Sequence, residues 1–432
     1  MRYGPKSLGV SFTGKTLTHF GGLFLLQQFL KRLDLRRLLQ RHVRFAQRNN
    51  RYSVGEMVLA LLYPIMLGLE RLETTHLLTR NGVFQYLTGL PTYPNATTLR
   101  RFLLRMAPAA LPKLRRLHDG LLNRVTEHDG PNRFIFDLDS TVVVVYGKQE
   151  QARIGYNPFK RGRPSYHPLL CFEGISRDFW HGELRAGDAH TAQGTVALLE
   201  ACFAKLPTSV RRVQVRADSG FYSRKLIEWL EDKQAGFAIV ARLTRPLKNA
   251  LPFLRYTVHR GGIETAEFFY EPHKWPHPYR FIAIRRLRPE DPSEQLTLFS
   301  TGRYSYQVLV TNLELQPLNL WRFYNDRAAI ELIVRELKGD YPLGRIPTKH
   351  FFANEAYFHL LLLAYNLINW FKRLCLPAEF RAMTLGTLRS RLLLAPAQLT
   401  RTNNRPTLKL PENFLYQQVW HHTLKQIERL RL

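Results

Sequence analysis

Three carboxylates in the sequence lie where a strand or a helix could present them to a metal ion. Asp139 is near the end of the alternating segment "RFIFDLDS", Asp218 follows "RRVQVRA", and Glu331 lies within "YNDRAAIELIVRELK" (324–338). Carboxylate oxygens are the ligands that hard cations such as Mg²⁺ prefer. Two such ions, roughly 3.5–4 Å apart, stabilise the attacking and leaving oxygens of a phosphoryl displacement. The three residues therefore predict a site for two Mg²⁺ ions, for which Mn²⁺ can substitute.

The segment 324–338 has the period of an amphipathic helix. At about 100° per residue, Tyr324, Arg327, Glu331 and Lys338 fall on one narrow stripe beside an apolar face. A solvated face with ion pairs between successive turns is one interpretation of such a stripe. If Glu331 binds metal, the same stripe predicts that Arg327 and Lys338 contact DNA phosphates. Tyr324 would then donate a hydrogen bond to a phosphate or pack on a sugar.

A second group of basic residues lies in the segment "YNPFKRGRPSYHP" (156–168), shortly after the first carboxylate. Lys160, Arg161 and Arg163 occur there between turn-forming Gly and Pro residues and near aromatic ones. The alternatives are a solvated basic loop and a loop that contacts phosphates while its aromatic rings stack on bases. The position of the loop favours DNA contact.

The charge of the chain also indicates a polyanionic partner. The 432 residues include 63 Lys and Arg but 34 Asp and Glu, a formal net charge of +29. Nucleic acid is the expected partner, and an anionic membrane surface is the weaker alternative. The apolar stretches 57–69 and 358–371 fall short of the ~20 residues that a membrane span needs. Because no secretory signal is apparent at the N-terminus, we expect a cytoplasmic, nucleoid-associated protein.

The elements that must position these residues follow from changes of period along the chain. Helical periodicity dominates the first part, and strand alternation begins at 132–147, where Asp137 and Asp139 share one face. We expect a hairpin over 167–187, a strand and a helix over 211–234, and short strands over 237–315. The predicted fold class is α/β. The expected parts are a helical DNA-binding domain (1–128), a catalytic core in two pieces (129–236 and 317–380), a β-rich segment (237–316) and a C-terminal helical segment (381–432).

The spacing of Tyr324, Arg327, Glu331 and Lys338 resembles the signature of the DDE transposases of bacterial insertion sequences. Together with "DLDST", "YNPFKRGRPSYHPLL" and "RADSGFYS", it is similar to the branch named after insertion sequence 1380. The resemblance implies an RNase H-like catalytic core, a β-rich insertion between the second Asp and the Glu, and Asp139, Asp218 and Glu331 as metal ligands. The first acid of the family is followed by a small residue and Thr. The triplet "DST" therefore favours Asp139, and Asp137 is interpreted either as a residue that supports the metal ligands or as structural.

The resemblance also implies an activity and its partners. It predicts a transposase that binds the terminal inverted repeats of its element, cleaves the ends and joins the freed 3′-hydroxyls to target DNA. Double-stranded DNA is then the partner, a homodimer pairs the two ends, and no membrane is involved. Two alternatives stay open: a structure-specific nuclease on the same fold, and a catalytically inactive DNA-binding protein derived from a transposase.

Overall fold

A computed structural model describes residues 12, 14, 16–46, 51–157, 160–287 and 304–432. The chain forms two compact units. The helical unit comprises Met1–Leu117, Asp340–Pro347 and His359–Leu432, and the sheet unit comprises His118–Gly339 and Thr348–Phe358. Helices α6 (Ala96–Asp129) and α12 (Phe351–Cys375) contribute residues to both units.

The helical unit contains most of the helices and a small antiparallel sheet of order β1-β14-β15. Its other helices are α1 (Leu23–Arg32), α2 (Leu35–His42), α3 (Val54–Leu67), η2 (Leu72–Thr75), α4 (His76–Thr79), α5 (Gly82–Thr88), α13 (Ala378–Arg381), α14 (Leu385–Leu388), η4 (Arg389–Leu393) and α15 (Gln417–Arg429). Its strands are β1 (Leu17–Thr18), β14 (Ala397–Thr402) and β15 (Arg405–Lys409). Residues 381–432, which we expected to be helical, thus also contain a β-hairpin.

Helix α3 illustrates how the sequence defines a buried helix in this unit. It begins with a capping box in which the Glu56 backbone N–H donates to Ser53 Oγ (3.2 Å) and the Ser53 N–H donates to Glu56 Oε2 (2.8 Å). It ends at Gly68, whose φ of 85° is a conformation that glycine adopts readily. Nearly all of its side chains are buried, as the apolar stretch 57–69 predicts. Among the residues that the structure describes, no helix is both long and apolar enough to cross a membrane.

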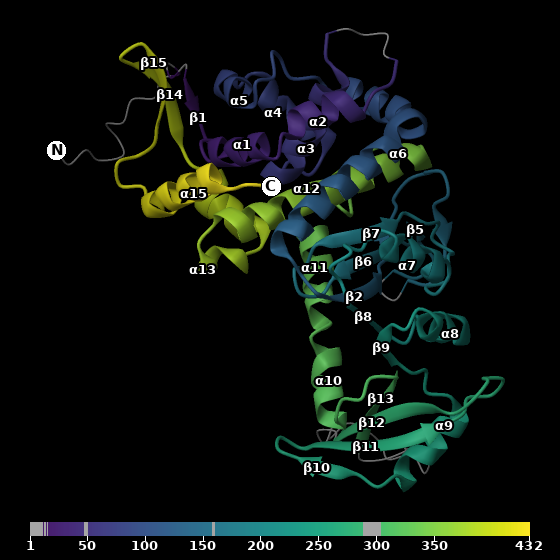
Figure 1. The fold of residues 1–432 in the computed structure, drawn as a ribbon. Coiled ribbons are helices and arrows are strands. Elements are labelled where there is room, and N and C mark those ends of the chain that lie inside the picture. Colours follow the sequence, from purple (N-terminus) through teal and green to yellow (C-terminus); the bar gives the residue numbers. More distant parts are fainter. Residues whose placement is uncertain (1–11, 13, 15, 47–50, 158–159, 288–303) are drawn as a thin grey trace, which may run out of the picture. The chain divides into compact units, whose positions relative to one another are not determined.

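The sheet unit is built on a nine-stranded mixed sheet of order β10-β11-β12-β13-β9-β8-β2-β6-β7 (Figure 1). The strands are β2 (Arg133–Ser140), β6 (Leu169–Glu173), β7 (Phe179–Glu183), β8 (Arg212–Ala217), β9 (Gly236–Val240), β10 (Thr257–His259), β11 (Ile263–Tyr270), β12 (Tyr279–Leu287) and β13 (Tyr304–Thr311). Strand β8 runs parallel to β2 and β9, and the other neighbours are antiparallel. The α/β class expected from the sequence is therefore confirmed.

Helices cover this sheet, and a smaller sheet lies beside it. The helices are α7 (Thr195–Phe203), α8 (Arg224–Asp232), α9 (Arg245–Ala250), η3 (Leu251–Phe253), α10 (Pro317–Asn325) and α11 (Ala328–Gly339). Helix α7 packs on β6 and β7, α8 on β9, and α10 on β9 and β11. The small antiparallel sheet has the order β3-β5-β4, formed by β3 (Val143–Val144), β4 (Arg153–Ile154) and β5 (Pro164–Tyr166).

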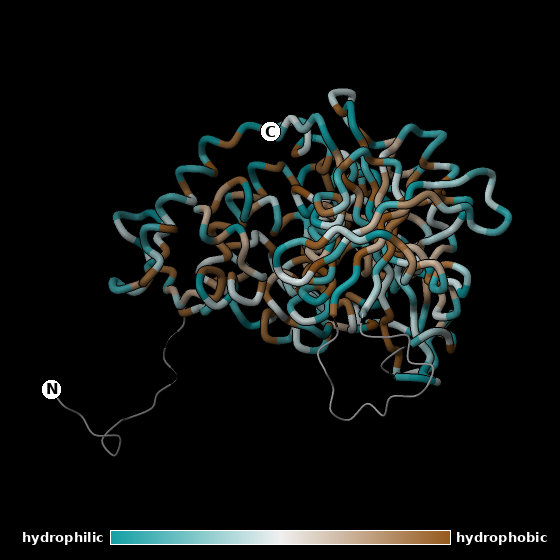
Figure 2. Tube along the Cα trace, turned by 90° about the horizontal axis from the view of Figure 1, so that it is seen from below, coloured by the Kyte–Doolittle hydropathy of each residue, from teal (hydrophilic) through white to brown (hydrophobic). Residues whose placement is uncertain are grey.

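The core of the sheet unit explains why β2 is apolar along most of its length. Phe134 and Phe136 are at most 2% exposed, and the Phe134 ring contacts Trp180 edge-on at 4.8 Å between centroids. Hydrophobic residues line the inner segments of the chain, whereas hydrophilic residues predominate in the outer loops (Figure 2). Strand β2 is thus an interior strand between β8 and β6, and its last residues, Asp139 and Ser140, are only partly buried.

Candidate active site

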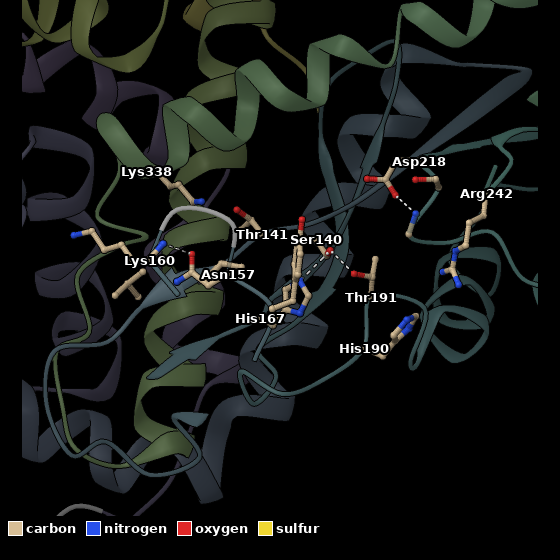
Figure 3. Close-up of a pocket in the computed structure, with 15 residues that line it drawn as sticks. Ser140, Thr141, Asn157, Lys160, His167, His190, Thr191, Asp218, Arg242 and Lys338 are labelled. Carbon is tan, nitrogen blue, oxygen red and sulfur yellow. Dashed lines mark hydrogen bonds between the residues drawn. The ribbon is translucent and has the colours of Figure 1, made fainter. Parts of the chain in front are cut away.

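Two of the three predicted carboxylates lie side by side because β2 and β8 are parallel neighbours. The ladder pairs Asp137 with Arg216, and the same offset two residues later brings Asp139 opposite Asp218. Both aspartates therefore lie at the carboxyl ends of their strands. Asp218 is oriented by its own turn, since the Gly220 N–H donates to Asp218 Oδ1 at 2.8 Å (Figure 3).

The third carboxylate follows a break in the helix that we expected over 324–338. Helix α10 ends at Asn325 and α11 begins at Ala328, in nearly the same direction (Figure 1). Between them the Arg327 N–H donates to the Tyr324 carbonyl at 3.0 Å, a tighter turn than that of an α-helix. The prediction of one continuous helix is wrong at this point. The turn directs Arg327 toward the sheet, while Glu331 lies one turn later and its side chain is 68% exposed.

Arg327 is the residue on which the three carboxylates converge. Its Nη2 donates to the Leu138 carbonyl at 2.7 Å and to Asp139 Oδ1 at 3.1 Å. The same nitrogen is 3.9 Å from Asp218 Oδ2, and Nη1 is 3.8 Å from Glu331 Oε1. Only 4% of Arg327 is exposed. The sequence led us to expect this guanidinium at the DNA surface, but it lies behind the acids and neutralises them.

Burial and neighbouring charges shift the ionisation of this cluster. Burial is the main cause that raises the pKa of Asp139 to about 6; the negative charges of Asp218 and Glu331 act in the same direction, and Arg327 opposes them. Burial alone would lower the pKa of Arg327, but Asp139, Tyr324 and Asp218 raise it above its ordinary value. The guanidinium therefore stays charged, and Asp139 is a desolvated carboxylate whose ionised form depends on a nearby cation.

Tyr324 supports this arrangement from the core rather than from the surface. It is 8% exposed and packs with Leu320 of α10 against Ala238, Ile282 and Leu309 of the sheet. Burial raises the pKa of its phenol. Tyr324 thus anchors the last turn of α10 directly before the turn that carries Arg327.

A cavity of ≈750 Å³ opens beside Asp218 (Figure 3). Three cations line it from separate segments: Lys160 between β4 and β5 of the small sheet, Arg242 after β9 and Lys338 near the end of α11. Desolvation lowers the pKa of Lys338, and the charge of Asp139 opposes this shift. A cavity with an acid on one wall and cations on the others suits a phosphodiester, because the cations neutralise its charge while the acid stays available for metal.

The three cations of the basic loop are exposed but have different surroundings. The Lys160 ammonium contacts the Tyr146 hydroxyl and lies 5.0 Å from the centre of that ring, and the Lys160 backbone N–H donates to Asn157 Oδ1 at 2.9 Å. Arg161 and Arg163 are exposed in the turn that follows, at whose centre Gly162 has a φ of 73°. Lys160 therefore belongs to the cavity wall, and the two arginines extend the positive surface outward.

Sequence reasoning missed the residues that fix the wall next to Asp139. Burial lowers the pKa of His167, so its ring is neutral at neutral pH. Its Nδ1–H donates to the Ala189 carbonyl at 2.8 Å, so Nε2 accepts from the Ser140 hydroxyl at 3.1 Å. Ser140 Oγ is also 3.5 Å from Thr191 Oγ1. No spacing in the sequence links His167, Thr191 or Arg242 to the acids, since each comes from a different segment.

The acids have the chemistry of a Mg²⁺ site but are not arranged as a finished one. Asp139, Asp218 and Glu331 offer only hard oxygen donors, which suit Mg²⁺ or Mn²⁺. Nevertheless, within the described ranges no group of three or more His, Cys, Asp or Glu side chains is positioned to hold a metal ion. In this arrangement the carboxylates share the Arg327 guanidinium as a cation, which is 3.1 Å from Asp139, 3.9 Å from Asp218 and 3.8 Å from Glu331. The carboxylates of Asp139, Asp218 and Glu331 fit a divalent cation when the Arg327 guanidinium moves away from them.

Comparisons with known proteins give the family. None of the curated protein sequences matches the chain. A solved structure, that of the piggyBac transposase synaptic complex with hairpin DNA, aligns with a TM-score of 0.44 and 9% sequence identity, over 95% of this chain and 81% of that one. The family model described as transposase DDE domain group 1 matches residues 2–432. The chain therefore belongs to this family of DDE transposases.

Proposed function

We propose that this DDE transposase binds the terminal inverted repeats of a bacterial insertion sequence, cleaves the ends and joins the 3′-hydroxyls to target DNA. We further propose that it belongs to the branch named after insertion sequence 1380. The observation that carries the proposal is the convergence of Asp139, Asp218 and Glu331 on Arg327, beside a cavity lined with cations. That residues from three distant segments meet there supports phosphoryl transfer as the reaction.

Asp139, Asp218 and Glu331 are the residues that would hold two Mg²⁺ ions. When bound, such ions lower the pKa of a nucleophilic water or hydroxyl and stabilise the leaving oxygen. Lys338 and Lys160 would neutralise the phosphate in the cavity, and Arg161 and Arg163 would contact the flanking backbone. The sequence assigns Arg327 and Tyr324 to DNA contact. Before DNA binds, Arg327 would neutralise the carboxylates, and Tyr324 would hold the helix turn that precedes Arg327.

The organisation proposed for this function keeps the boundaries expected from the sequence. An RNase H-like core would consist of 129–236 and 317–380, interrupted by the β-rich insertion 237–316. The parallel pair β2 and β8, which carries two of the acids, supports this proposal. The helical segment 1–128 would read the transposon ends, and 381–432 would form a C-terminal part. Strands β10 to β13 continue the main sheet through β9, so the proposed insertion would be anchored to the core.

The partners follow from the same proposal. A net charge of +29 supports binding to double-stranded DNA in the nucleoid. Synapsis of two ends would require at least a homodimer.

Incubation with a labelled duplex that ends in the element's own inverted repeat tests the function. The purified protein should give Mg²⁺-dependent cleavage and, when target DNA is added, joined products. Glu331→Gln is the matched control, because it removes one ligand charge at an exposed position. Cleavage without joining would favour the nuclease alternative. Binding without any Mg²⁺- or Mn²⁺-dependent product would overturn the proposal in favour of a DNA-binding protein.

A further inference from the structure

Directly behind the proposed metal ligands lies a second, fully buried ion pair. Arg216 Nε donates to Asp137 Oδ1 at 2.7 Å, and Arg216 Nη2 donates to Asp137 Oδ2 at 2.8 Å. Asp137 is 1% exposed and Arg216 is 2% exposed. Both oxygens of Asp137 are thus used by one guanidinium, in the bidentate geometry that gives the strongest and most directional pairing.

The position of this pair in the sheet links it to the active site. Asp137 and Arg216 are direct partners in the parallel ladder between β2 and β8. Because side chains alternate along a strand, Asp139 and Asp218 are the next residues on the same face. A slip of either strand by one residue would turn one of these aspartates to the opposite face. The bidentate pair opposes such a slip at the position immediately before the two acids.

The same guanidinium also holds the end of α10, which precedes the turn that carries Arg327. Arg216 Nη1 donates to the Phe323 carbonyl at 2.6 Å, and the Phe323 ring lies 5.0 Å from the guanidinium carbon. Phe323 lies in the last turn of α10, four residues before Arg327. One side chain therefore connects β2 and β8, which lead to Asp139 and Asp218, with the end of α10, which precedes the turn that carries Arg327.

A glycine makes room for the pair on its remaining side. A Cβ atom at Gly174 would lie 2.7 Å from Arg216 Nη2 and 2.9 Å from Asp137 Oδ2. The Gly174 N–H donates to the Ile135 carbonyl at 2.7 Å, which fixes this backbone against β2. A larger residue would have to displace either the backbone or the ion pair.

We infer that Asp137 and Arg216 form a positioning pair, which sets the register of Asp139 against Asp218 and holds the turn that carries Arg327. The inference rests on the proposed function, since it assigns the pair to the same site. The geometry also explains why Asp137 is not itself a ligand, although it shares a strand face with Asp139. Neither of its oxygens is available to a metal ion while Arg216 is in place.

The test must separate positioning from folding. Each single truncation would strand a buried charge and destabilise the sheet. The informative variant is the double replacement Asp137→Leu with Arg216→Met, because an apolar pair of similar volume preserves stability but lacks directional bonds. We expect a melting temperature close to that of the parent and unchanged binding to the end duplex. Mn²⁺ affinity, measured by electron paramagnetic resonance without DNA, should fall by about 10–100-fold, as is typical when a residue that supports a metal ligand is lost. The cleavage rate should fall by a similar factor.

Two further variants make the outcome decisive. Arg216→Lys keeps the charge but loses the bidentate bond, so Mn²⁺ affinity should fall less than in the double variant. This variant decides the question if the double variant does not fold. The matched control replaces another ion pair of the same sheet, Glu264→Leu with Arg285→Met, whose charged atoms are 2.6 Å apart. This control should keep the parental Mn²⁺ affinity and cleavage rate.

The failure of the inference is distinct from the failure of the proposed function. If the parent protein neither binds Mn²⁺ nor cleaves, the function is wrong. If the parent does both and the folded double variant matches it in Mn²⁺ affinity and cleavage, the pair is merely structural and the inference is overturned. Parental Mn²⁺ affinity in Arg216→Lys would overturn it in the same way if the double variant does not fold.

Discussion

Replacing Arg327 by Met should leave the acidic cluster without its shared counter-charge. The magnitude follows from the exposure of each partner: the side chain of Asp139 is 14% exposed, that of Asp218 45% and that of Glu331 68%. Loss of one partner of a buried pair costs ~3–5 kcal/mol, whereas exposed pairs contribute ~0–1 kcal/mol. The contact with Asp139 therefore dominates, and the free energy of unfolding should fall by about 3 kcal/mol without divalent metal.

The assay is thermal unfolding with and without Mn²⁺. A loss of about 3 kcal/mol corresponds to a melting temperature lower by roughly 6–12 °C for a unit of 150–250 residues. A bound cation would supply the missing positive charge, and saturation at 100 times the dissociation constant adds ~2.7 kcal/mol. Mn²⁺ should therefore restore most of the lost stability in Arg327→Met, and it should stabilise this variant more than the parent, in which the guanidinium competes for the same carboxylates. Arg335→Met, an exposed position on α11, is the matched control and should change little.

Two results would refute this reasoning. If Arg327→Met unfolds at the parental temperature without metal, the guanidinium is not the counter-ion of the cluster. If Mn²⁺ stabilises parent and variant equally, Arg327 does not compete with metal for the carboxylates.

Three other predictions concern ligands and surface charge. Asp139→Asn should abolish cleavage with the fold intact, whereas Asp137→Asn should lose about 3–5 kcal/mol of stability because Arg216 is left unpaired; urea unfolding and a cleavage assay separate the two, and an inactive but stable Asp137→Asn would contradict this ranking. Glu331→Gln should keep the parental melting temperature and DNA affinity but lose cleavage and joining together, since both reactions use the same ligand; near-parental cleavage in Mg²⁺ would remove Glu331 from the site. DNA affinity should fall with salt at a log–log slope of about −0.9 per neutralised phosphate, and a flat response in a filter-binding titration would remove the electrostatic argument.

Period and composition predicted several elements of the sheet unit well. Alternation over 132–147 predicts a strand, and β2 occupies Arg133–Ser140. The hairpin expected over 167–187 is formed by β6 and β7, and the helix expected after Asp218 is α8. These elements depend on local patterns of apolar residues, which a single sequence displays directly.

The site could be predicted only in part because its geometry depends on contacts between distant segments. Asp137 and Asp139 are equivalent in strand period, and in the structure they differ in their partners: Arg216 takes both oxygens of Asp137, whereas Arg327 donates to Asp139. The break at Arg327 escapes a helical wheel, since Asp326 and Arg327 are both compatible with a helix. An arginine on a polar stripe is also expected to be exposed, yet Arg327 is buried, and its Nη2 donates to the Leu138 carbonyl and to the Asp139 carboxylate.

The two guanidiniums of the acidic cluster impose an order on its assembly during protein synthesis. Arg216 follows Asp137 by 79 residues, and Arg327 follows Leu138 by 189 residues. At about 5–20 residues per second, the ribosome supplies the first partner after about 4–16 s and the second after about 10–40 s. The strands can thus be joined in register well before the cation that neutralises Asp139 emerges. The cluster around Asp139 therefore cannot be complete until Arg327 and Glu331 have been synthesised, and residues Thr348–Phe358 of the same unit follow later still.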